Sequence, residues 1–300
     1  MKTKILKILL IVVLMVLCGC DNQNVTERVD IIVPQGNPFI AVGNLIGEEN
    51  IYIDNVNGAA GVKAALVTDK YDIIIAPLNL GVQLYNSENS KYLLDSVIAF
   101  GNTYIISKKD KKLENINDLD GKTILAYSQG GTPDIIMQYI LKENDVNANI
   151  DYQPSLTEVV PFFVQGKYDY ILAAEPVITN LIVNKKIDLN ILNLQEYTEI
   201  NIMQAAVFVN PESAKIEPVK NVIKKIEENI RNMNKNSKEY AEQIIQKDVY
   251  FSDLGVDILS VSIPNSNLNY LKASKNKEKI EQFLNMINYK YPNEEFYNQN

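Results

Sequence analysis

The stretch Lys167-Tyr168-Asp169-Tyr170-Ile171-Leu172-Ala173-Ala174-Glu175-Pro176 has a near-copy upstream, Lys70-Tyr71-Asp72-Ile73-Ile74-Ile75-Ala76-Pro77. The two copies are offset by 167 − 70 = 97 residues, and the same offset superposes Val62 on Val159. In each copy a Lys-Tyr-Asp turn follows an amphipathic segment, an apolar run is typical of a strand buried on both faces, and a proline ends that strand. The repeat predicts two similar α/β lobes.

Strand and helix patterns alternate through both halves of the chain. Apolar runs at 29–33, 51–56 and 73–76 are separated by helical patterns in the first half, and runs at 122–127, 148–152 and 170–174 are separated in the same way in the second. Alternation with short links predicts parallel sheets covered by helices on both faces. After Val209 we expect helices only, the first beginning with Pro211 at its first position, and no further strand.

These patterns predict an α/β fold of two Rossmann-like lobes with parallel-dominated sheets, joined by two hinge strands. The predicted limits are residues 29–101 plus 206–300 for a discontinuous lobe 1, and residues 102–205 for lobe 2. Ligands of such sheets bind outside the carboxyl ends of the strands. Two lobes facing across a hinge therefore predict one cleft that closes around a ligand.

The composition excludes several classes of function. The 300-residue chain has no His and no Trp, so imidazole bases, His-activated nucleophiles and His-ligated metals are ruled out. A net charge of −8 and a pI near 4.9 argue against nucleic acid as a partner, because phosphate binding needs clustered Lys and Arg. We expect no catalytic residue, no metal and no cofactor, and hence no enzyme.

The N-terminus is typical of an export signal. Lys2, Lys4 and Lys7 precede an unbroken apolar run at 8–17, which is too short to span a bilayer. An uncleaved signal anchor is the alternative. We expect residues 1–20 to be a signal peptide and the polar residues 21–28 to be a tether to the folded body.

The last four residues of that segment, Leu17-Cys18-Gly19-Cys20, resemble the lipobox of bacterial lipoproteins. Cys18 stands where Ala or Ser is more usual. The resemblance implies lipidation, by diacylation (palmitate), of Cys20 as the first residue of the mature chain. It places the protein on the extracytoplasmic face of the cell membrane, held there by its lipid anchor.

The body of the chain resembles the substrate-binding lipoproteins of ABC importers with the type II periplasmic binding fold. The nearest group is the sulfonate, nitrate, taurine and thiamine-precursor binding set (SsuA/THI5-like, NMT1-like). The unit at 59–77, the strand end at 168–176, the stretch Ile263-Pro264-Asn265-Ser266-Asn267-Leu268 and the terminal Pro292-Asn293-Glu294-Glu295-Phe296-Tyr297 carry this resemblance. It implies a monomeric receptor whose partners are a small solute and the permease and ATPase subunits of the importer.

The candidate ligand-binding residues follow the predicted strands at their carboxyl ends or border the hinge. They are Gln35, Gly36, Asn37, Asn57, Gly58, Pro77, Asn79, Asn102, Ser128, Gln129, Gly130, Thr132, Glu175 and Gln204. The side-chain amides either bind the ligand or serve as turn residues. Tyr104, Tyr127 and Tyr152 either stack on a planar ligand or fill the core.

Two of these places carry the most specific expectations. Residues 128–132 either offer glycine N–H groups to an anionic ligand at a helix start, where the helix dipole favours negative charge, or serve only to cap the helix. In the second case Thr132 is the N-cap, Pro133 stands at N1, and the negative Asp134 follows. Glu175 aims a carboxylate either at the ligand or at a partner within the protein such as a backbone N–H, since a buried carboxylate needs one.

The sequence therefore predicts an extracytoplasmic lipoprotein that captures a small polar or anionic organic solute for an ABC permease. Two alternatives stay open. One is a pyrimidine-synthase-like or dehydratase-like enzyme on the same fold, against which the missing His argues. The other is a sensing or adhesive lipoprotein that binds no solute.

Overall fold

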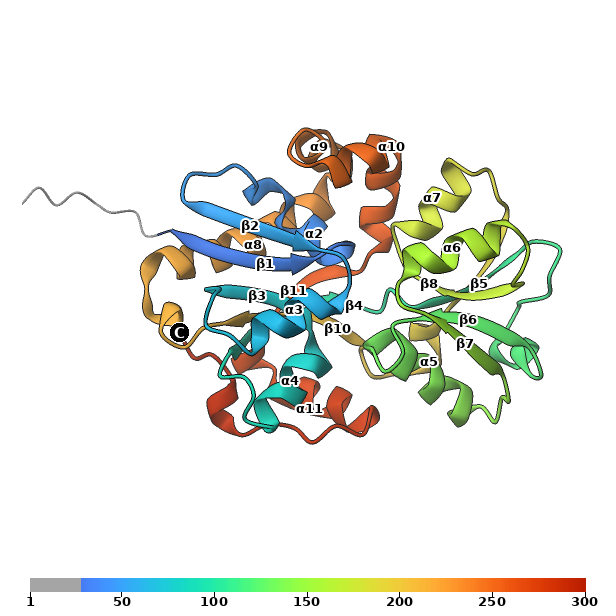
Figure 1. The fold of residues 1–300 in the computed structure, drawn as a ribbon, viewed down its shortest axis with the longest axis horizontal. Helices are drawn as coiled ribbons and strands as arrows, with labels where there is room; N and C mark the ends of the chain where they lie inside the picture. Colours follow the sequence, from blue (N-terminus) through green and yellow to red (C-terminus); the bar gives the residue numbers. More distant parts are fainter. Residues whose placement is uncertain (1–27) are drawn as a thin grey trace, which may run out of the picture.

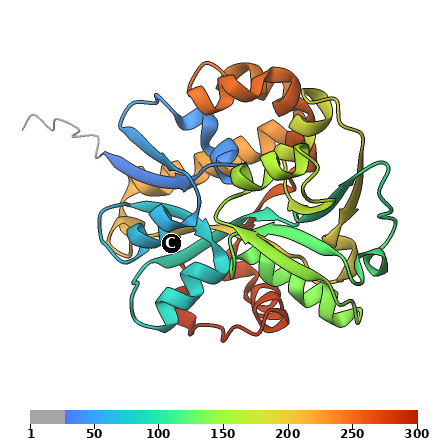
Figure 2. The same ribbon diagram turned by 45° about the vertical axis from the view of Figure 1, so that its right-hand side comes forward.

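The computed structural model describes residues 28–300 (Figure 1). The predicted signal peptide, the predicted acylation site Cys20 and residues 21–27 of the predicted tether lie outside the described residues. Two sheets form the framework, one in each lobe, and helices cover both faces of each sheet (Figures 1 and 2).

Lobe 1 is built on a six-stranded sheet with the order β11-β4-β10-β3-β1-β2. Its strands are β1 (Val29–Pro34), β2 (Ile51–Val56), β3 (Ile73–Pro77), β4 (Leu93–Phe100), β10 (Met203–Val209) and β11 (Leu268–Lys272). Its helices are α2 (Asn37–Val42), α3 (Ala59–Leu66), α4 (Leu78–Asn86), α8 (Glu217–Lys235), α9 (Ser237–Ile244), α10 (Val249–Asn265) and α11 (Lys277–Met286).

Lobe 2 is built on a five-stranded sheet with the order β7-β6-β8-β5-β9. Its strands are β5 (Tyr104–Lys108), β6 (Thr123–Tyr127), β7 (Asn149–Gln153), β8 (Tyr170–Ala173) and β9 (Leu189–Asn193). Its helices are α5 (Thr132–Glu143), α6 (Leu156–Val164) and α7 (Val177–Val183), and the 3₁₀ helix η3 (Leu194–Tyr197) follows β9.

The two sheets repeat one topology. The order β2-β1-β3-β10-β4 in lobe 1 corresponds strand for strand to β7-β6-β8-β5-β9 in lobe 2. In both, the first three strands are parallel, the fourth runs antiparallel to them, and the fifth runs in the same direction as the first three. The repeated Lys-Tyr-Asp stretches lead into β3 and β8, which occupy equivalent positions, so the expectation of two similar lobes is confirmed.

One hydrogen bond is duplicated along with the topology. The hydroxyl of Tyr71 donates to Oδ2 of Asp54 at 2.7 Å, and the hydroxyl of Tyr168 donates to Oδ2 of Asp151 at 2.7 Å. Both residues of the second pair lie 97 positions after those of the first, since 54 + 97 = 151 and 71 + 97 = 168. In each lobe the bond ties the turn before the repeated strand to the edge strand of the parallel half.

The fold differs from the prediction in three respects. The sheets are mixed, because β10 in lobe 1 and β5 in lobe 2 run antiparallel to the strands on both sides of them. β11 adds a strand after Val209, where only helices were expected, and pairs with β4 at the sheet edge. Pro211 precedes the 3₁₀ turn at Ser213–Lys215, and α8 begins at Glu217 with Pro218 in its first turn, so the expected N1 proline was placed one helix too early.

The chain crosses between the lobes at 101–103 and at 194–202. Met203, the first residue of β10, already pairs with Phe100 of β4 in the lobe 1 sheet. We therefore propose that lobe 2 ends before Met203, slightly earlier than the limit of 205 expected from the sequence.

The strand patterns place apolar side chains on both faces of the lobe 1 sheet. Ile73 and Ile75 of β3 pack into a core with α2, α8, α9 and α10. Ile74 and Ala76 point to the opposite core, which contains α3, α4 and α11 and continues into lobe 2. Helices of lobe 1 therefore sandwich the sheet, and its strand ends are left to face lobe 2.

Helix α4 approaches the sheet closely at Gly81. A Cβ built at Gly81 would lie 2.1 Å from Cζ of the buried Phe208 on β10. We predict that Gly81→Ala lowers the free energy of unfolding by about 1–3 kcal/mol, because the core must accommodate an atom that does not fit. Chemical denaturation measures this loss.

A compensating substitution provides the control. Phe208→Leu in the Gly81→Ala background removes ring atoms from the same place, so it should recover part of the loss. A Gly81→Ala protein as stable as the wild type would contradict the packing described here.

Candidate functional site

A cavity of about 260 Å³ lies between the lobes at the carboxyl ends of their strands. Loops after β1, β2 and β3 line it from lobe 1, and loops after β6, β7 and β8 line it from lobe 2. The crossing at 101–103 and the start of β10 close its back through Asn102 and Gln204. Its size is just below the range of about 300–1,000 Å³ that is typical of small-molecule sites.

The cavity brings together most of the residues expected from the sequence. Those that line it are Gln35, Gly36, Asn37, Asn57, Gly58, Pro77, Asn102, Ser128, Thr132, Glu175 and Gln204. Asn79, Gln129 and Gly130 are not among its lining residues, and the structure does not place them there. Of the three tyrosines considered for stacking, Tyr127 lines the cavity, whereas Tyr104 and Tyr152 do not.

Sequence reasoning missed the loop between β7 and α6. Three residues of this loop, Ser155, Leu156 and Thr157, line the cavity. Ser155 is the counterpart of Gly58 in the internal repeat, because 58 + 97 = 155. The internal repeat therefore contained the signal for them. Tyr250 at the start of α10 also lines the cavity, and no sequence signal singled it out.

The hinge residue Asn102 is fastened to the loop after β8. The backbone N–H of Glu175 donates to Oδ1 of Asn102 at 2.8 Å, and Nδ2 of Asn102 donates to the carbonyl of Glu175 at 3.4 Å. Asn102 has a φ of 49°, a left-handed conformation that Asn tolerates better than most residues. Its amide thus holds the crossing to the cavity wall.

The side-chain amides of Gln204 and Asn37 also form hydrogen bonds within the protein. Nε2 of Gln204 donates to the carbonyl of Gly101 and to Oγ1 of Thr103, which ties the two crossings together. Nδ2 of Asn37 donates to the carbonyl of Ser266 at 3.0 Å and Oδ1 accepts from the Ser266 hydroxyl at 3.1 Å, which ties the first loop to the end of α10.

For the glycine loop before α5, the sequence left two alternatives open, an anion site or ordinary capping, and the loop's own hydrogen bonds match the second. The N–H of Gly130 donates to Oδ2 of Asp134 at 2.7 Å, and the N–H of Gly131 donates to the carbonyl of Ser128 at 2.7 Å. The helix begins at Thr132 with Gly131 as its N-cap, so the expectation of a Thr132 cap was wrong. Both glycine N–H groups are therefore used within the loop.

Thr132 instead connects the lobes. Its hydroxyl donates to Oδ1 of Asn79 on α4 at 2.8 Å, and both side chains are buried. Nδ2 of Asn79 donates to the hydroxyl of Tyr289 at 3.4 Å. Asn79 therefore lies behind the cavity wall as a contact between lobes.

Glu175 is only 6% exposed and has a partner within the protein. The backbone N–H of Thr179 donates to Oε2 and the Thr179 hydroxyl to Oε1, each at 3.0 Å, so the carboxylate caps the first turn of α7. Burial raises the pKa of Glu175 above its ordinary value, while hydrogen bonds from Thr179 and Asn265 oppose that rise. Of the two alternatives considered, this geometry matches the internal backbone partner.

Two half-buried phenols line the cavity, Tyr127 from lobe 2 and Tyr250 from lobe 1. Burial raises the pKa of Tyr127, and it raises the pKa of Tyr250 to about 12 against the effect of a hydrogen bond with the backbone of Gly36. The Tyr250 ring packs on Phe39 and Phe251 at centroid distances of 5.7 and 5.5 Å. Both phenols therefore remain neutral at physiological pH and present aromatic surface.

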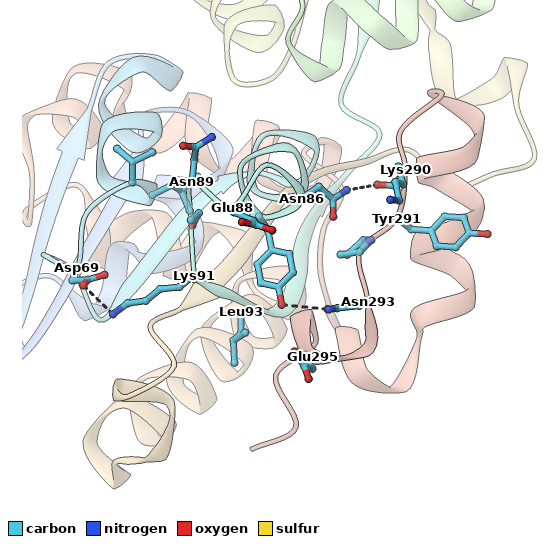
Figure 3. A pocket seen from close by; sticks show the side chains of 15 residues that line it. Asp69, Asn86, Glu88, Asn89, Lys91, Leu93, Lys290, Tyr291, Asn293 and Glu295 are labelled. Atoms are coloured by element: carbon cyan, nitrogen blue, oxygen red, sulfur yellow. Dashed lines mark hydrogen bonds and ion pairs between the residues drawn. The ribbon is translucent and has the colours of Figure 1, made fainter.

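A larger groove of about 940 Å³ lies on the outer side of lobe 1, away from the strand ends (Figure 3). Several of its polar side chains are paired with one another or with backbone: Asp69 with Lys91 at 2.9 Å, Tyr85 with Asn293 at 3.2 Å, and Asn86 with the Lys290 carbonyl at 2.6 Å. It is an open surface hollow over the C-terminal segment. The interlobe cavity, where both lobes converge, is the better candidate site.

Within residues 28–300 no group of three or more Asp, Glu, Cys or His side chains is arranged to hold a metal ion. Nor does any helix in this part of the chain have the length and apolar character needed to cross a membrane.

Comparison with known proteins agrees with this architecture. Residues 93–240, nearly half of the chain, match the family model described as NMT1/THI5 like. No curated protein matches the sequence. The described fold is similar to that of an ABC transporter protein from Parabacteroides distasonis, with a TM-score of 0.76 and 19% identity over 90% of this chain and 98% of that chain.

Two sulfonate-binding proteins have the same fold. The alkanesulfonate-binding protein SsuA from Xanthomonas axonopodis pv. citri, bound to MOPS, gives a TM-score of 0.64 with 14% identity over 89% of this chain and 95% of that one. The periplasmic aliphatic sulphonate binding protein SsuA from Escherichia coli gives 0.69 with 11% identity over 87% and 86%. The chain thus has the fold of the periplasmic binding proteins of ABC transporters. Within it, residues 93–240 form an NMT1/THI5-like segment.

The buried carboxylate gives a test of the site's electrostatics. Because the pKa of Glu175 is raised in the folded state, the folded protein binds a proton more readily than the unfolded chain above pH 4.5. Stability contributed by this group is therefore present at low pH and is lost as the pH rises from about 4.5 through the raised pKa. We predict that Glu175→Gln removes this dependence.

The measurement is the free energy of unfolding of both proteins at a series of pH values. The difference between wild type and Glu175→Gln should change by at most about 1.4 kcal/mol per pH unit inside that window and stay flat outside it. Glu143→Gln, at an exposed position on α5, is the matched control. A Glu175→Gln profile parallel to the wild type would show that the carboxyl is not perturbed.

Proposed function

We propose that this protein is the extracytoplasmic solute receptor of an ABC importer, which captures a small organic molecule in the interlobe cavity. The observation that carries the proposal is the position of the cavity. It lies between two lobes of repeated topology, at the strand ends of both, and against both crossings of the chain. A solute there contacts both lobes at once, so its binding energy favours their approach.

The contacts between the lobes suit a receptor that closes. Thr132 meets Asn79, and the hydroxyl of Tyr104 in lobe 2 donates to the carbonyl of Asn265 on α10 at 3.2 Å. These bonds are few and lie around the cavity, while the crossings are short. Closing is therefore the motion that this connectivity allows, and the closed form is the state that a permease would recognise.

An enzyme on the same fold is the second candidate, but the cavity contains few groups that could act as a catalytic acid or base. The lining residues contain one carboxylate, Glu175, which is engaged with Thr179, and two phenols whose pKa values are raised. General acid and base catalysis needs groups whose pKa lies near the working pH and which reach the substrate. The structures similar to this chain are transport binding proteins, which also favours the receptor.

A ligand screen tests the receptor. We predict that at least one member of a panel of sulfonates, pyrimidines, amino-acid derivatives and nitrate-like anions raises the melting temperature. A ligand at 100 times its Kd contributes about 2.7 kcal/mol of stability. Recovery of the compound unchanged after incubation separates a receptor from an enzyme, and no stabilisation across the panel would count against binding of a solute.

The bond between Thr132 and Asn79 tests whether closure accompanies binding. We predict that Asn79→Ala weakens the affinity for a solute found in the screen by about two- to ten-fold, because a hydrogen bond between lobes is worth about 0.5–1.5 kcal/mol. Asn79 lies outside the cavity lining, so the loss would act through lobe closure. Asn147→Ala, at an exposed loop position of lobe 2, is the control. Equal affinities for all three proteins would contradict this role.

We further propose that the receptor works as a monomer and is held at the membrane by lipid on Cys20, as the sequence before the described residues indicates. We predict that the full chain expressed in a bacterium with labelled palmitate incorporates the label and fractionates with membranes. Cys20→Ala should lose both properties, and Cys18→Ala should keep them. Labelling of the Cys20→Ala protein would rule out this anchor.

A further inference from the structure

The lining of the interlobe cavity lacks a positive side chain. Among the described residues that line it there is no Lys and no Arg, and Glu175 is the one carboxylate. The other polar side chains that line it include amides and hydroxyls. A fully charged anion buried there would have no cationic partner from these residues, and burial of an unpaired charge is costly.

On the lobe 2 side of the cavity, the helix starts are neutralised by carboxylates of the protein itself. The N-terminus of a helix carries a partial positive charge that favours anions. Three of the helices that begin at the cavity already hold a carboxylate there: Asp134 in the first turn of α5, Glu158 in that of α6, and Glu175 bonded to the N–H of Thr179 in α7. The helices that begin at the cavity from lobe 1, α2, α3 and α4, have no acid in their first turns.

The carboxylate of Asp134 is held in place by several hydrogen bonds within the protein. It is completely buried and accepts hydrogen bonds from the N–H of Gly130 at 2.7 Å, from Tyr152 at 2.9 Å and from Gln138 at 2.9 Å. The positive end of α5 therefore faces a carboxylate that cannot swing away to make room for a ligand anion. An incoming anion would meet this fixed negative charge close to the lobe 2 wall.

Much of the remaining cavity surface is apolar. Five prolines line it, and proline has no backbone N–H to offer: Pro34, Pro38, Pro77, Pro133 and Pro176. Alanine, leucine and valine side chains and the rings of Tyr127 and Tyr250 supply most of the rest. The amides of Asn37 and Asn102 each donate one hydrogen bond to a protein acceptor, and the amide of Gln204 donates two. Such walls suit a ring with an apolar face and few polar groups.

We propose that this cavity selects an uncharged or cationic, ring-bearing solute and discriminates against anions such as sulfonates. The inference rests on the proposed receptor function and narrows the class of its ligand. It separates this chain from the alkanesulfonate-binding protein with the same fold, for which a sulfonate-bearing compound is the bound molecule.

The experiment is a thermal-shift and calorimetric screen of the protein against sets of three compounds that share one ring skeleton. Each ring skeleton is supplied as an amide, an amine and a sulfonate, for example benzamide, benzylamine and benzenesulfonate, so that charge is the main variable. We expect stabilisation by amides or amines and at least ten-fold weaker binding of the sulfonate with the same skeleton. A sulfonate that binds as tightly as its amide or amine would overturn the inference and leave the receptor function standing. No binding by any member would contradict both.

A positive charge introduced at the rim tests whether the discrimination between amine and sulfonate arises in this cavity. Asn57 is exposed and lines the mouth. Asn57→Lys should weaken the amine by about three- to ten-fold and strengthen the sulfonate, with a smaller change for the amide. Gln165→Lys adds the same charge at an exposed position after α6, away from the lining, and should change none of the three affinities. Equal responses of the amine to both substitutions would overturn the assignment of the probe to this cavity.

Discussion

The structure depends on how the chain supplies the central antiparallel strand of each sheet. β5 lies between β8 and β9, and β10 lies between β3 and β4, and each of them begins directly after a crossing between the lobes. Neither sheet can be completed until the chain has crossed. The two lobes are therefore joined by the crossings of the chain, and the side chain of Gln204 adds hydrogen bonds from the start of β10 to Gly101 and Thr103 of the first crossing.

This connectivity places the cavity. Parallel strands end at the same edge of a sheet, so the loops after β1, β2 and β3 converge on those after β6, β7 and β8 across the crossings. The helices that follow these loops point their positive ends at the same space. On the lobe 2 side, carboxylates of the protein oppose that positive charge, since Asp134 and Glu175 accept hydrogen bonds from N–H groups at or beside helix starts. The helix starts of lobe 1 carry no such acid.

The repeat at an offset of 97 residues was the most informative part of the sequence. It correctly predicted two lobes of one topology, and it holds down to the paired bonds of Tyr71 with Asp54 and Tyr168 with Asp151. It also contained Ser155, which was overlooked because the strand-end rule was not applied to β7. Strand β11 was missed because Leu268–Lys272 is short, partly polar and at a sheet edge, where pairing with β4 rather than apolar pattern stabilises the strand.

The sequence by itself determined the buried strands, the positions of their carboxyl ends and hence most residues of the candidate site, because apolar periodicity and strand-ending prolines and glycines are local signals. Tertiary structure alone decided what those residues do. Asn79, Asn102 and Gly130 all stand at strand ends or crossings, yet each is paired with a group of the protein that lies elsewhere in the chain or in its own loop. Hydrogen-bond partners depend on distances between segments far apart in sequence, and no local pattern encodes those distances.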